Sequence, residues 1–413
     1  MRASFLPRPR AADNSSFPVG RGISEGADVQ RSSERIITTH VGSLPRPPEL
    51  LDAVEASQQG KPVPESTGAQ SLRAAVKEVV RKQIDLGIDV IDDGEFGKTS
   101  FVAYVNERLG GFEPDKQARA ERPWAQSREA KSFPEFYAAS PALARPRRMV
   151  CTAPVSYRGK GGLQVDIDNL KAAVDGLRPL ELFMPAISPS SAADWLRNGF
   201  YKTEEEYLFA IADALREEYE AIVDAGLLLQ VDDPHLVTHW TKEADLGREQ
   251  WRKWAEAKVE ALNYALRNIP AEKIRHHTCY GINMGPRIHD LELKHIVDVI
   301  LKIRAGAYSF EAANPRHEHE WKVWETVKLA DDKCLIPGVI SHSTVLVEHP
   351  ELVAERIGRF ANVVGRERVI AGADCGFASF AGSKEVHPSI VWAKFKSLAD
   401  GARIASKQLW GKG

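Results

Sequence analysis

Short apolar runs alternate with amphipathic stretches along most of this chain. The runs typical of β-strands span residues 35–42, 88–92, 149–153, 227–231, 273–279, 307–311, 334–340 and 368–372. The stretches with helical periodicity lie between them, at residues 71–86, 204–225, 248–267, 291–304, 350–364 and 387–406. Alternating strands and helices favour a parallel sheet with crossover helices. Eight such strands predict an α/β fold of the closed (β/α)8 TIM-barrel type.

Three segments fall outside this alternation. Residues 181–187 form a ninth apolar run, which we assign to an excursion between strands three and four because Ser188 begins a Ser-Pro-Ser-Ser turn directly after it. Residues 112–147 are rich in charge, proline and alanine, and predict a segment inserted between strands two and three. Residues 1–34 lack periodicity and the apolar core of a secretory signal, which favours a disordered leader over a transit peptide. The sequence therefore predicts one catalytic barrel over residues 35–413.

Polar side chains gather where the predicted strands end. They are Ser43 after strand one, Glu95 after strand two, Asp232 after strand four, Cys279 ending strand five, Glu311 ending strand six, His342 after strand seven and Cys375 after strand eight. The carboxyl ends of barrel strands converge on one mouth, where catalytic groups lie. We therefore expect these side chains to share one site.

His277 and Cys279 are two residues apart in a predicted strand, so both side chains point to the same face. With Cys375 and Glu311 at other strand ends, they provide two thiols, an imidazole and a carboxylate, a set suited to four-coordinate zinc. His276 is an alternative ligand, but it faces away from Cys279 and is expected to pack or to support the site.

A rival His-x-His pair, His317 and His319, lies in the charged segment 314–321. Its place after a strand predicts a loop that opens a helix. This position favours substrate binding or surface pairs over metal binding.

Glu95 and Asp232 each allow two interpretations. A carboxylate here could cap a helix, or the two could hold a substrate ammonium between them at the barrel mouth. The residues alone leave both readings open. His342 can act as a general acid, because imidazole titrates near neutrality. The alternative is a supporting histidine that is hydrogen-bonded to Ser343.

Composition excludes several classes of partner. A formal net charge of −2 over 413 residues gives no basis for binding nucleic acid or an anionic membrane surface, and no run of about 18 apolar residues predicts a membrane span. Four cysteines do not make a disulfide framework in a chain this long, so reduced thiols in a cytoplasmic protein are expected. Cys151 and Cys334 lie in apolar runs and are expected to be buried. The sequence leaves open whether the protein forms a homo-oligomer.

Several stretches of the chain resemble one family, in the family's order. They are THVGSLPRP (39–47), GIDVIDDGEFGKTSFVAYV (87–105), QVDDP (230–234), HTCY (277–280), the strand ending in Glu311, PGVISHS (337–343) and ADCGF (373–377). Over about residues 36–406, the chain resembles the C-terminal catalytic barrel of cobalamin-independent methionine synthase, in the short form that has a single barrel.

The resemblance implies a set of functional residues and a reaction. The positions that match are His277, Cys279, Glu311 and Cys375 as ligands of Zn2+, Ser43, Glu95 and Asp232 as amino-acid-binding residues, and His342 as general acid. The implied reaction is S-methylation of homocysteine to methionine, by attack of a zinc-bound thiolate on a methyl donor such as a methyltetrahydrofolate. The alternatives are a zinc-dependent alkyltransferase similar to epoxyalkane:coenzyme M transferases and a metal-free lyase similar to uroporphyrinogen decarboxylase.

Some segments depart from the long enzymes of this family. Residues 153–169 follow the run predicted as strand three, where the long enzymes carry a tryptophan that stacks on a pterin, and Tyr157 is the candidate replacement. Residues 112–147 and 314–321 resemble a branch of short homologues instead. The sequence therefore leaves the methyl or alkyl donor open.

Overall fold

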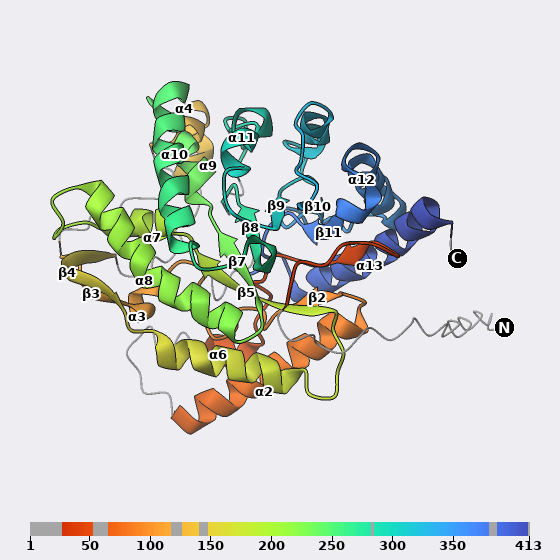
Figure 1. Ribbon diagram of the computed structural model, residues 1–413, viewed down its shortest axis with the longest axis horizontal. Helices are drawn as coiled ribbons and strands as arrows, with labels where there is room; N and C mark the ends of the chain where they lie inside the picture. Colours follow the sequence, from red (N-terminus) through yellow and green to blue (C-terminus); the bar gives the residue numbers. More distant parts are fainter. Residues whose placement is uncertain are drawn as a thin grey trace, which may run out of the picture.

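Eight parallel strands form a barrel at the centre of the protein (Figure 1). In chain order they are β1 (Ile37–Thr38), β2 (Val90–Ile91), β5 (Glu181–Ile187), β7 (Leu228–Asp232), β8 (Ile274–Thr278), β9 (Ala307–Phe310), β10 (Cys334–Ile340) and β11 (Ile370–Ala373). The sheet runs from β2 through β5, β7, β8, β9, β10 and β11 to β1. A parallel bridge between Thr39 and Val90 joins β1 to β2 and closes the ring. The predicted (β/α)8 TIM barrel is confirmed.

The structure is a computed structural model that describes residues 27–52, 65–116, 126–139, 148–281, 285–379 and 386–411. Most of the predicted leader, residues 1–26, lies outside the described residues. The residues just before the barrel contact it. Val29 donates its N–H to the Glu272 carbonyl over 2.7 Å, and Ser32 Oγ donates to the Val369 carbonyl over 2.6 Å. The domain boundary at residue 35 stays a prediction.

The third barrel strand differs from the sequence prediction. The run at 181–187 is β5, which pairs with β2 and β7, so its assignment to an excursion is wrong. The run at 149–153 belongs instead to β4 (Met149–Tyr157), in a separate sheet with β3 (Leu109–Pro114) and β6 (Leu196–Arg197). Every residue of β5 is buried, whereas β4 mixes buried and exposed positions. Such mixing is typical of a sheet with one solvated face and distinguishes β4 from a barrel strand.

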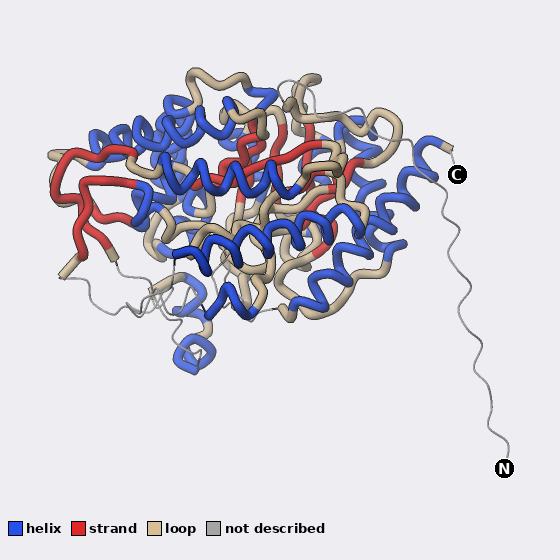
Figure 2. Tube along the Cα trace, turned by 90° about the horizontal axis from the view of Figure 1, so that it is seen from below, coloured by secondary structure: helices blue, strands red, loops and turns tan. Residues whose placement is uncertain are grey.

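The three-stranded sheet lies at one side of the barrel, far from the C-terminus in both views (Figures 1 and 2). Its first two strands both lie between β2 and β5 in the chain: β3 overlaps the start of the predicted insertion at 112–147, whereas β4 follows that insertion. Within that insertion, residues 117–125 and 140–147 lie outside the described residues. The chain leaves the barrel again between β5 and β7, where β6 pairs with β4. An insertion and an excursion are thus both present, although the residues of the excursion differ from the predicted ones.

Helices surround the barrel (Figure 1). In chain order, the helices are α2 (Glu65–Asp85), α3 (Val105–Arg108), α4 (Arg128–Ser132), α5 (Pro134–Ala139), α6 (Lys160–Ala173), α7 (Pro189–Trp195), α8 (Glu204–Asp224), α9 (His235–Lys242), α10 (Arg248–Ala265), α11 (Val297–Ile300), α12 (Pro350–Val364) and α13 (Pro388–Trp410), and the 3-10 turns are η1 (Ala271–Lys273), η2 (Leu293–His295), η3 (Glu318–Glu325) and η4 (Arg366–Arg368). The helix expected at 291–304 divides into η2 and α11, because the backbone of Ile296 leaves helical geometry at φ −125°. Within the described residues, no helix has both the length and the apolar character that a membrane crossing needs.

Helix α8 shows how the local sequence sets the ends of an element. Thr203 Oγ1 accepts the N–H of Glu206 at 3.1 Å, which satisfies a donor at the start of the helix. Gly226 adopts φ +79° directly after the helix, a conformation that glycine adopts without strain. The helix thus begins at the predicted residue and ends one residue before the predicted end. From the buried face of α8, Tyr219 Oη donates to the Ile187 carbonyl and so supports the end of the third barrel strand.

Candidate active site

A pocket lies at the carboxyl ends of the barrel strands. It is lined by Val41, Ser43, Glu95, Phe101, Asp232, Pro234, His277, Cys279, Cys375, Gly376 and Ser379. Six of the predicted site residues are therefore in one pocket. The other two, Glu311 and His342, belong to a neighbouring group of side chains.

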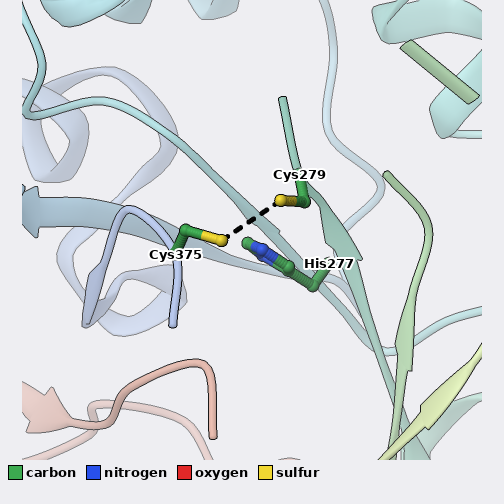
Figure 3. A group of neighbouring side chains, drawn as sticks. All are labelled: His277, Cys279 and Cys375. Carbon is green, nitrogen blue, oxygen red and sulfur yellow. Dashed lines mark hydrogen bonds between the residues drawn. The ribbon is translucent and has the colours of Figure 1, made fainter. Parts of the chain in front are cut away.

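His277, Cys279 and Cys375 form what we call the thiol cluster (Figure 3). Their ligand atoms lie within 4.8 Å of one another, and the two Sγ atoms are 3.1 Å apart. His277 lies in β8 and Cys279 directly follows that strand, so their two-residue spacing places both side chains on one face. Cys375 follows β11 and reaches the other two only because the barrel brings these strand ends together.

The thiol cluster has a ligand atom whose lone pair is free to bind a metal. His277 Nδ1 lies 3.1 Å from Ser309 Oγ, whereas its buried Nε2 has no hydrogen-bond partner among the described residues. Burial lowers the pKa of His277 to about 3, so the imidazole is neutral at pH 7. The contact with Cys279 and burial raise the pKa of the Cys375 thiol well above its usual value. Two thiols beside an unpartnered, neutral imidazole nitrogen fit a soft-ligand metal such as zinc.

Glu311 lies in a second group with His342 and Asp374, which we call the carboxylate cluster. The ligand atoms of this cluster also lie within 4.8 Å of one another. Glu311 accepts hydrogen bonds from Arg287 Nη1 at 2.9 Å and Arg287 Nη2 at 3.2 Å. Burial alone would raise the pKa of Glu311, but the guanidinium reverses this effect and lowers the pKa to about 2. The structure thus places the Glu311 carboxylate outside the thiol cluster.

Two atoms of this cluster, His342 Nδ1 and Asp374 Oδ2, are buried and have no hydrogen-bond partner in the described part of the chain. Burial lowers the pKa of His342 to about 4. Burial and the nearby Glu311 raise the pKa of Asp374 to about 7. Ser343 Oγ lies 2.9 Å from Ser341 Oγ, so the hydroxyl considered as a partner of His342 has a partner of its own.

Glu95 and Asp232 bring two buried carboxylates to the pocket. Glu95 has a left-handed backbone, with φ 59°, and its N–H donates to Asp93 Oδ1 at 2.9 Å. Glu95 Oε2 lies 3.6 Å from Lys98 Nζ, and Asp232 Oδ1 accepts from Gln230 Nε2 at 2.9 Å. Burial and then repulsion by Glu95 raise the pKa of Asp232 well above its usual value. A substrate cation between the two carboxylates would relieve this repulsion.

The helix-capping interpretation belongs to Asp233 and not to Asp232. Asp233 Oδ1 accepts the N–H of Leu236 in the first turn of α9, at 3.4 Å. It also accepts from Ser188 Oγ at 2.7 Å and from Ser191 Oγ at 3.1 Å. Asp232 is therefore left to face the pocket.

Ser43 enters the pocket on a loop that packs closely against its neighbours. Gly42 adopts φ +130°, and a Cβ at this position would lie 2.6 Å from a proline side chain. A Cβ on Gly376 would lie 2.0 Å from Ser43 Oγ, and Phe377 donates its N–H to the Ser43 carbonyl at 2.9 Å. Glycine is therefore needed at both positions for Ser43 to lie against the loop that carries Cys375.

The structure splits the rival His317–His319 pair. His317 is buried, with Nδ1 2.7 Å from Glu320 Oε2 and Nε2 3.2 Å from Asp290 Oδ2, whereas His319 is exposed. Burial alone would lower the pKa of His317, but these carboxylates raise it to about 9. His317 thus forms ion pairs in the interior, not the surface pairs that we considered.

Arg287 is the residue near the site that sequence reasoning missed. It is buried in the loop after β8, adopts φ 57°, and contacts both Glu311 and Asp290, the latter with Nε 2.8 Å from Oδ2. A lone arginine in an irregular loop has no periodicity or spacing that would mark it. Its role depends on a contact that only the folded chain creates.

Other residues considered from the sequence lie away from the pocket. His276 is on the opposite face of β8, with Nδ1 3.5 Å from Thr278 Oγ1. Cys151 and Cys334 are buried, as predicted. Tyr157 ends β4 in the small sheet. The pterin contact proposed for Tyr157 required a position directly after the third barrel strand. That strand is β5, and the segment after it begins at Ser188, so Tyr157 does not occupy this position.

Comparison with known proteins adds the family. The profile described as "Cobalamin-independent synthase, Catalytic domain" matches residues 36–139 and 192–393. The methionine synthase of Saccharolobus islandicus is 27% identical over 380 residues, which cover 91% of this chain and 96% of that protein. The methionine synthase of Saccharolobus solfataricus is 27% identical over 382 residues, with the same coverage of each chain.

Two solved structures show that the fold is shared with other proteins. The B12-independent methionine synthase of Shewanella sp. W3-18-1, in complex with selenomethionine, matches with a TM-score of 0.70 at 20% identity, covering 92% of this chain and 100% of that chain. The putative vitamin-B12 independent methionine synthase of Listeria monocytogenes matches with a TM-score of 0.62 at 18% identity and the same coverage. The profile match spans most of the barrel and includes every predicted site residue. The chain is therefore a methyltransferase-type enzyme and belongs to the cobalamin-independent synthase catalytic-domain family.

Proposed function

We propose that this protein is a zinc-dependent homocysteine S-methyltransferase that forms methionine. The observation that supports this most strongly is that one pocket is lined by both the thiol cluster and the carboxylates Glu95 and Asp232. A substrate with a thiol at one end and an ammonium at the other matches this pair of features. The relatives named methionine synthase point to the same substrate.

The pocket residues would bind the amino-acid end of homocysteine. Glu95 and Asp232 would hold the ammonium, since both carboxylates line the pocket and a cation between them would relieve their mutual repulsion. The loop at Ser43 would hold the carboxylate. A sulfonate acceptor such as coenzyme M would instead be repelled by Glu95 and Asp232, which argues against that alternative.

His277, Cys279 and Cys375 would hold the metal. Their donor set, two thiolates and one imidazole nitrogen, suits zinc. When bound, zinc lowers the pKa of a coordinated thiol and so supplies a thiolate nucleophile at neutral pH. Ser309 keeps the His277 ring oriented through its contact with Nδ1, which leaves Nε2 for the metal.

His342 would give a proton to the leaving group. Burial lowers its pKa to about 4, so the resting imidazole is neutral at pH 7. The proton that the homocysteine thiol loses when it becomes a thiolate would first charge this imidazole, and the nearby Glu311 carboxylate favours the imidazolium. His342 would then pass that proton to the leaving group. Transfer of the methyl group and protonation of the leaving group would then occur together.

The purified protein tests this proposal directly. We expect about one zinc per chain, as in other catalytic zinc sites with three protein ligands, and methionine formation from homocysteine that stops when a chelator removes the metal. Methyltetrahydrofolate forms and simple methyl donors would be compared as donors. Absence of zinc, or activity that survives its removal, would refute the proposal. The cytoplasmic location stays a prediction, and the sequence leaves the methyl donor and the oligomeric state open.

A further inference from the structure

Gln230 is a buried glutamine beneath the pocket. It lies two residues before Asp232 in β7, so both side chains are on the face of the strand that lines the pocket. The amide nitrogen of Gln230 donates two hydrogen bonds, one to the Val41 carbonyl and one to Asp232 Oδ1 at 2.9 Å. A carbonyl oxygen can only accept, which places the nitrogen of the amide on this side. One nitrogen atom therefore joins the two halves of the proposed amino-acid site.

The loop that carries Ser43 is also held by a second side chain inside the barrel. Arg275 is the partner of Gln230 in the register of β7 and β8, and both residues are buried. The guanidinium of Arg275 donates to Thr39 Oγ1 at 2.9 Å and to the His40 carbonyl at 2.7 Å. The interior of the barrel therefore holds this loop at several consecutive residues.

The same loop lies directly against the second carboxylate of the pocket. A Cβ added to Gly42 would lie 3.0 Å from Glu95 Oε1, so the backbone approaches this carboxylate closely. Val41 and Ser43, on either side of Gly42, line the pocket together with Asp232. The proposed ammonium and carboxylate sites are therefore adjacent. This arrangement fits an α-amino acid, because its ammonium and carboxylate are bonded to one carbon.

The amide oxygen of Gln230 does not contribute to stability. Gln230 Oε1 is buried and has no hydrogen-bond partner among the described residues. An unsatisfied buried oxygen destabilises a folded protein, and an apolar side chain of similar size would avoid this loss. The two contacts of the amide nitrogen therefore account for a glutamine at this position better than stability does.

We propose that Gln230 is a positioning residue that fixes the spacing between Asp232 and the Ser43 loop, and that it thereby selects thiols with an ammonium and a carboxylate on one carbon. This inference rests on the proposed homocysteine site. When the two halves of the site are held at a fixed spacing, binding of one end of the substrate raises the effective concentration of the other end. Without Gln230, each end still meets its partner, but the two contacts reinforce each other less.

Calorimetric titration of the zinc-loaded enzyme with three thiols tests the inference. Homocysteine carries both charged groups, mercaptopropylamine lacks the carboxylate, and mercaptobutyrate lacks the ammonium, whereas the thiol is the same in all three. Gln230→Met should weaken homocysteine binding by about 10- to 100-fold, the effect expected when a hydrogen bond to a charged group is lost. The affinities for the two analogues should be nearly unchanged. An equal loss for all three thiols would show a merely structural role and would overturn the inference.

Two further variants control for folding and for the loss of a buried hydrogen bond. Gln230→Asn keeps an amide but is one methylene shorter, so it cannot reach both acceptors and should show the same selective loss even if Gln230→Met does not fold. Tyr308→Phe removes a buried hydrogen bond to the Ile303 carbonyl, 2.8 Å long, on another barrel strand, and should leave all three affinities unchanged.

The wild-type enzyme separates failure of this inference from failure of the proposed function. If the wild type bound homocysteine no better than the two analogues, the proposed function would fall, and the inference with it. If the wild type preferred homocysteine and both Gln230 variants kept this preference, only the inference would fall.

Discussion

The thiol cluster and the carboxylate cluster lie side by side at the barrel mouth, yet His277 of the first and Glu311 of the second differ in the partners of their side chains. In the thiol cluster, His277 Nε2 is buried without a hydrogen-bond partner among the described residues, and the two Sγ atoms lie 3.1 Å apart. In the carboxylate cluster, Glu311 is surrounded by donors. A residue of ligand type at a strand end can therefore have its lone pairs occupied by other groups of the folded chain.

The same contrast appears in the charges. His277 is neutral at pH 7, because burial lowers its pKa to about 3. Glu311 stays ionised, because Arg287 overcomes the effect of burial and lowers its pKa to about 2. A metal would bring positive charge to the thiol cluster, whereas the carboxylate cluster already contacts the guanidinium of Arg287. Four substitutions would break or sharpen this comparison.

The largest effect is expected from Cys375→Ser. It removes a soft ligand from the thiol cluster, so the loss of metal affinity should exceed the roughly 100-fold that loss of an outer partner costs. Homocysteine methylation should fall to background. Zinc content after dialysis and chelator competition would measure this. Cys334→Ser, at another buried cysteine far from the pocket, is the matched control and should retain zinc.

His342→Gln should come next. It removes the proposed proton donor from the carboxylate cluster and leaves the thiol cluster intact. We expect kcat to fall by about 100- to 10,000-fold, the usual contribution of general acid catalysis, with zinc content and the KM for homocysteine little changed. Steady-state kinetics over a range of pH would check this. An unaltered kcat, or loss of zinc, would contradict the assigned role.

Asp232→Asn tests the opposite end of the pocket. Loss of a charged contact to the ammonium should raise the KM for homocysteine by about 10- to 100-fold. The same change should raise the free energy of unfolding at pH 7, because burial and repulsion from Glu95 destabilise the ionised Asp232. Kinetics and thermal denaturation would be measured together. A variant that binds homocysteine normally would show that the ammonium lies elsewhere.

The smallest effect on catalysis is expected from His317→Gln, which acts on the support of Arg287. The ion pairs raise the pKa of His317 from 6.5 to about 9, so its stabilising contribution is fully present below pH 6.5 and is lost as the pH rises through 9. The shift corresponds to about 3 kcal/mol. Denaturant unfolding of the metal-free protein should show this decline in the wild type and not in the variant. The exposed His319→Gln should behave as the wild type does.

The third barrel strand was assigned to the wrong run, which shows that a local hydrophobic pattern cannot by itself identify a barrel strand. The runs 149–153 and 181–187 are both apolar and both end near polar turns. What separates them is burial on both faces, which depends on the helices and strands that pack around each run. No property of either run alone contains that information, so the prediction chose the earlier one.

The sequence by itself determined the barrel class, the strand ends that carry the chemistry, and the pairing of His277 with Cys279, because periodicity and two-residue spacing act over a few neighbouring residues. The sequence placed Cys375 and Glu311 at the same barrel mouth, but only the tertiary structure decided that Cys375 lies in the thiol cluster and Glu311 in the carboxylate cluster. Both outcomes depend on contacts between residues far apart in the chain. For Glu311, the deciding contact is with Arg287, whose buried position and left-handed backbone arise only once the surrounding segments have packed.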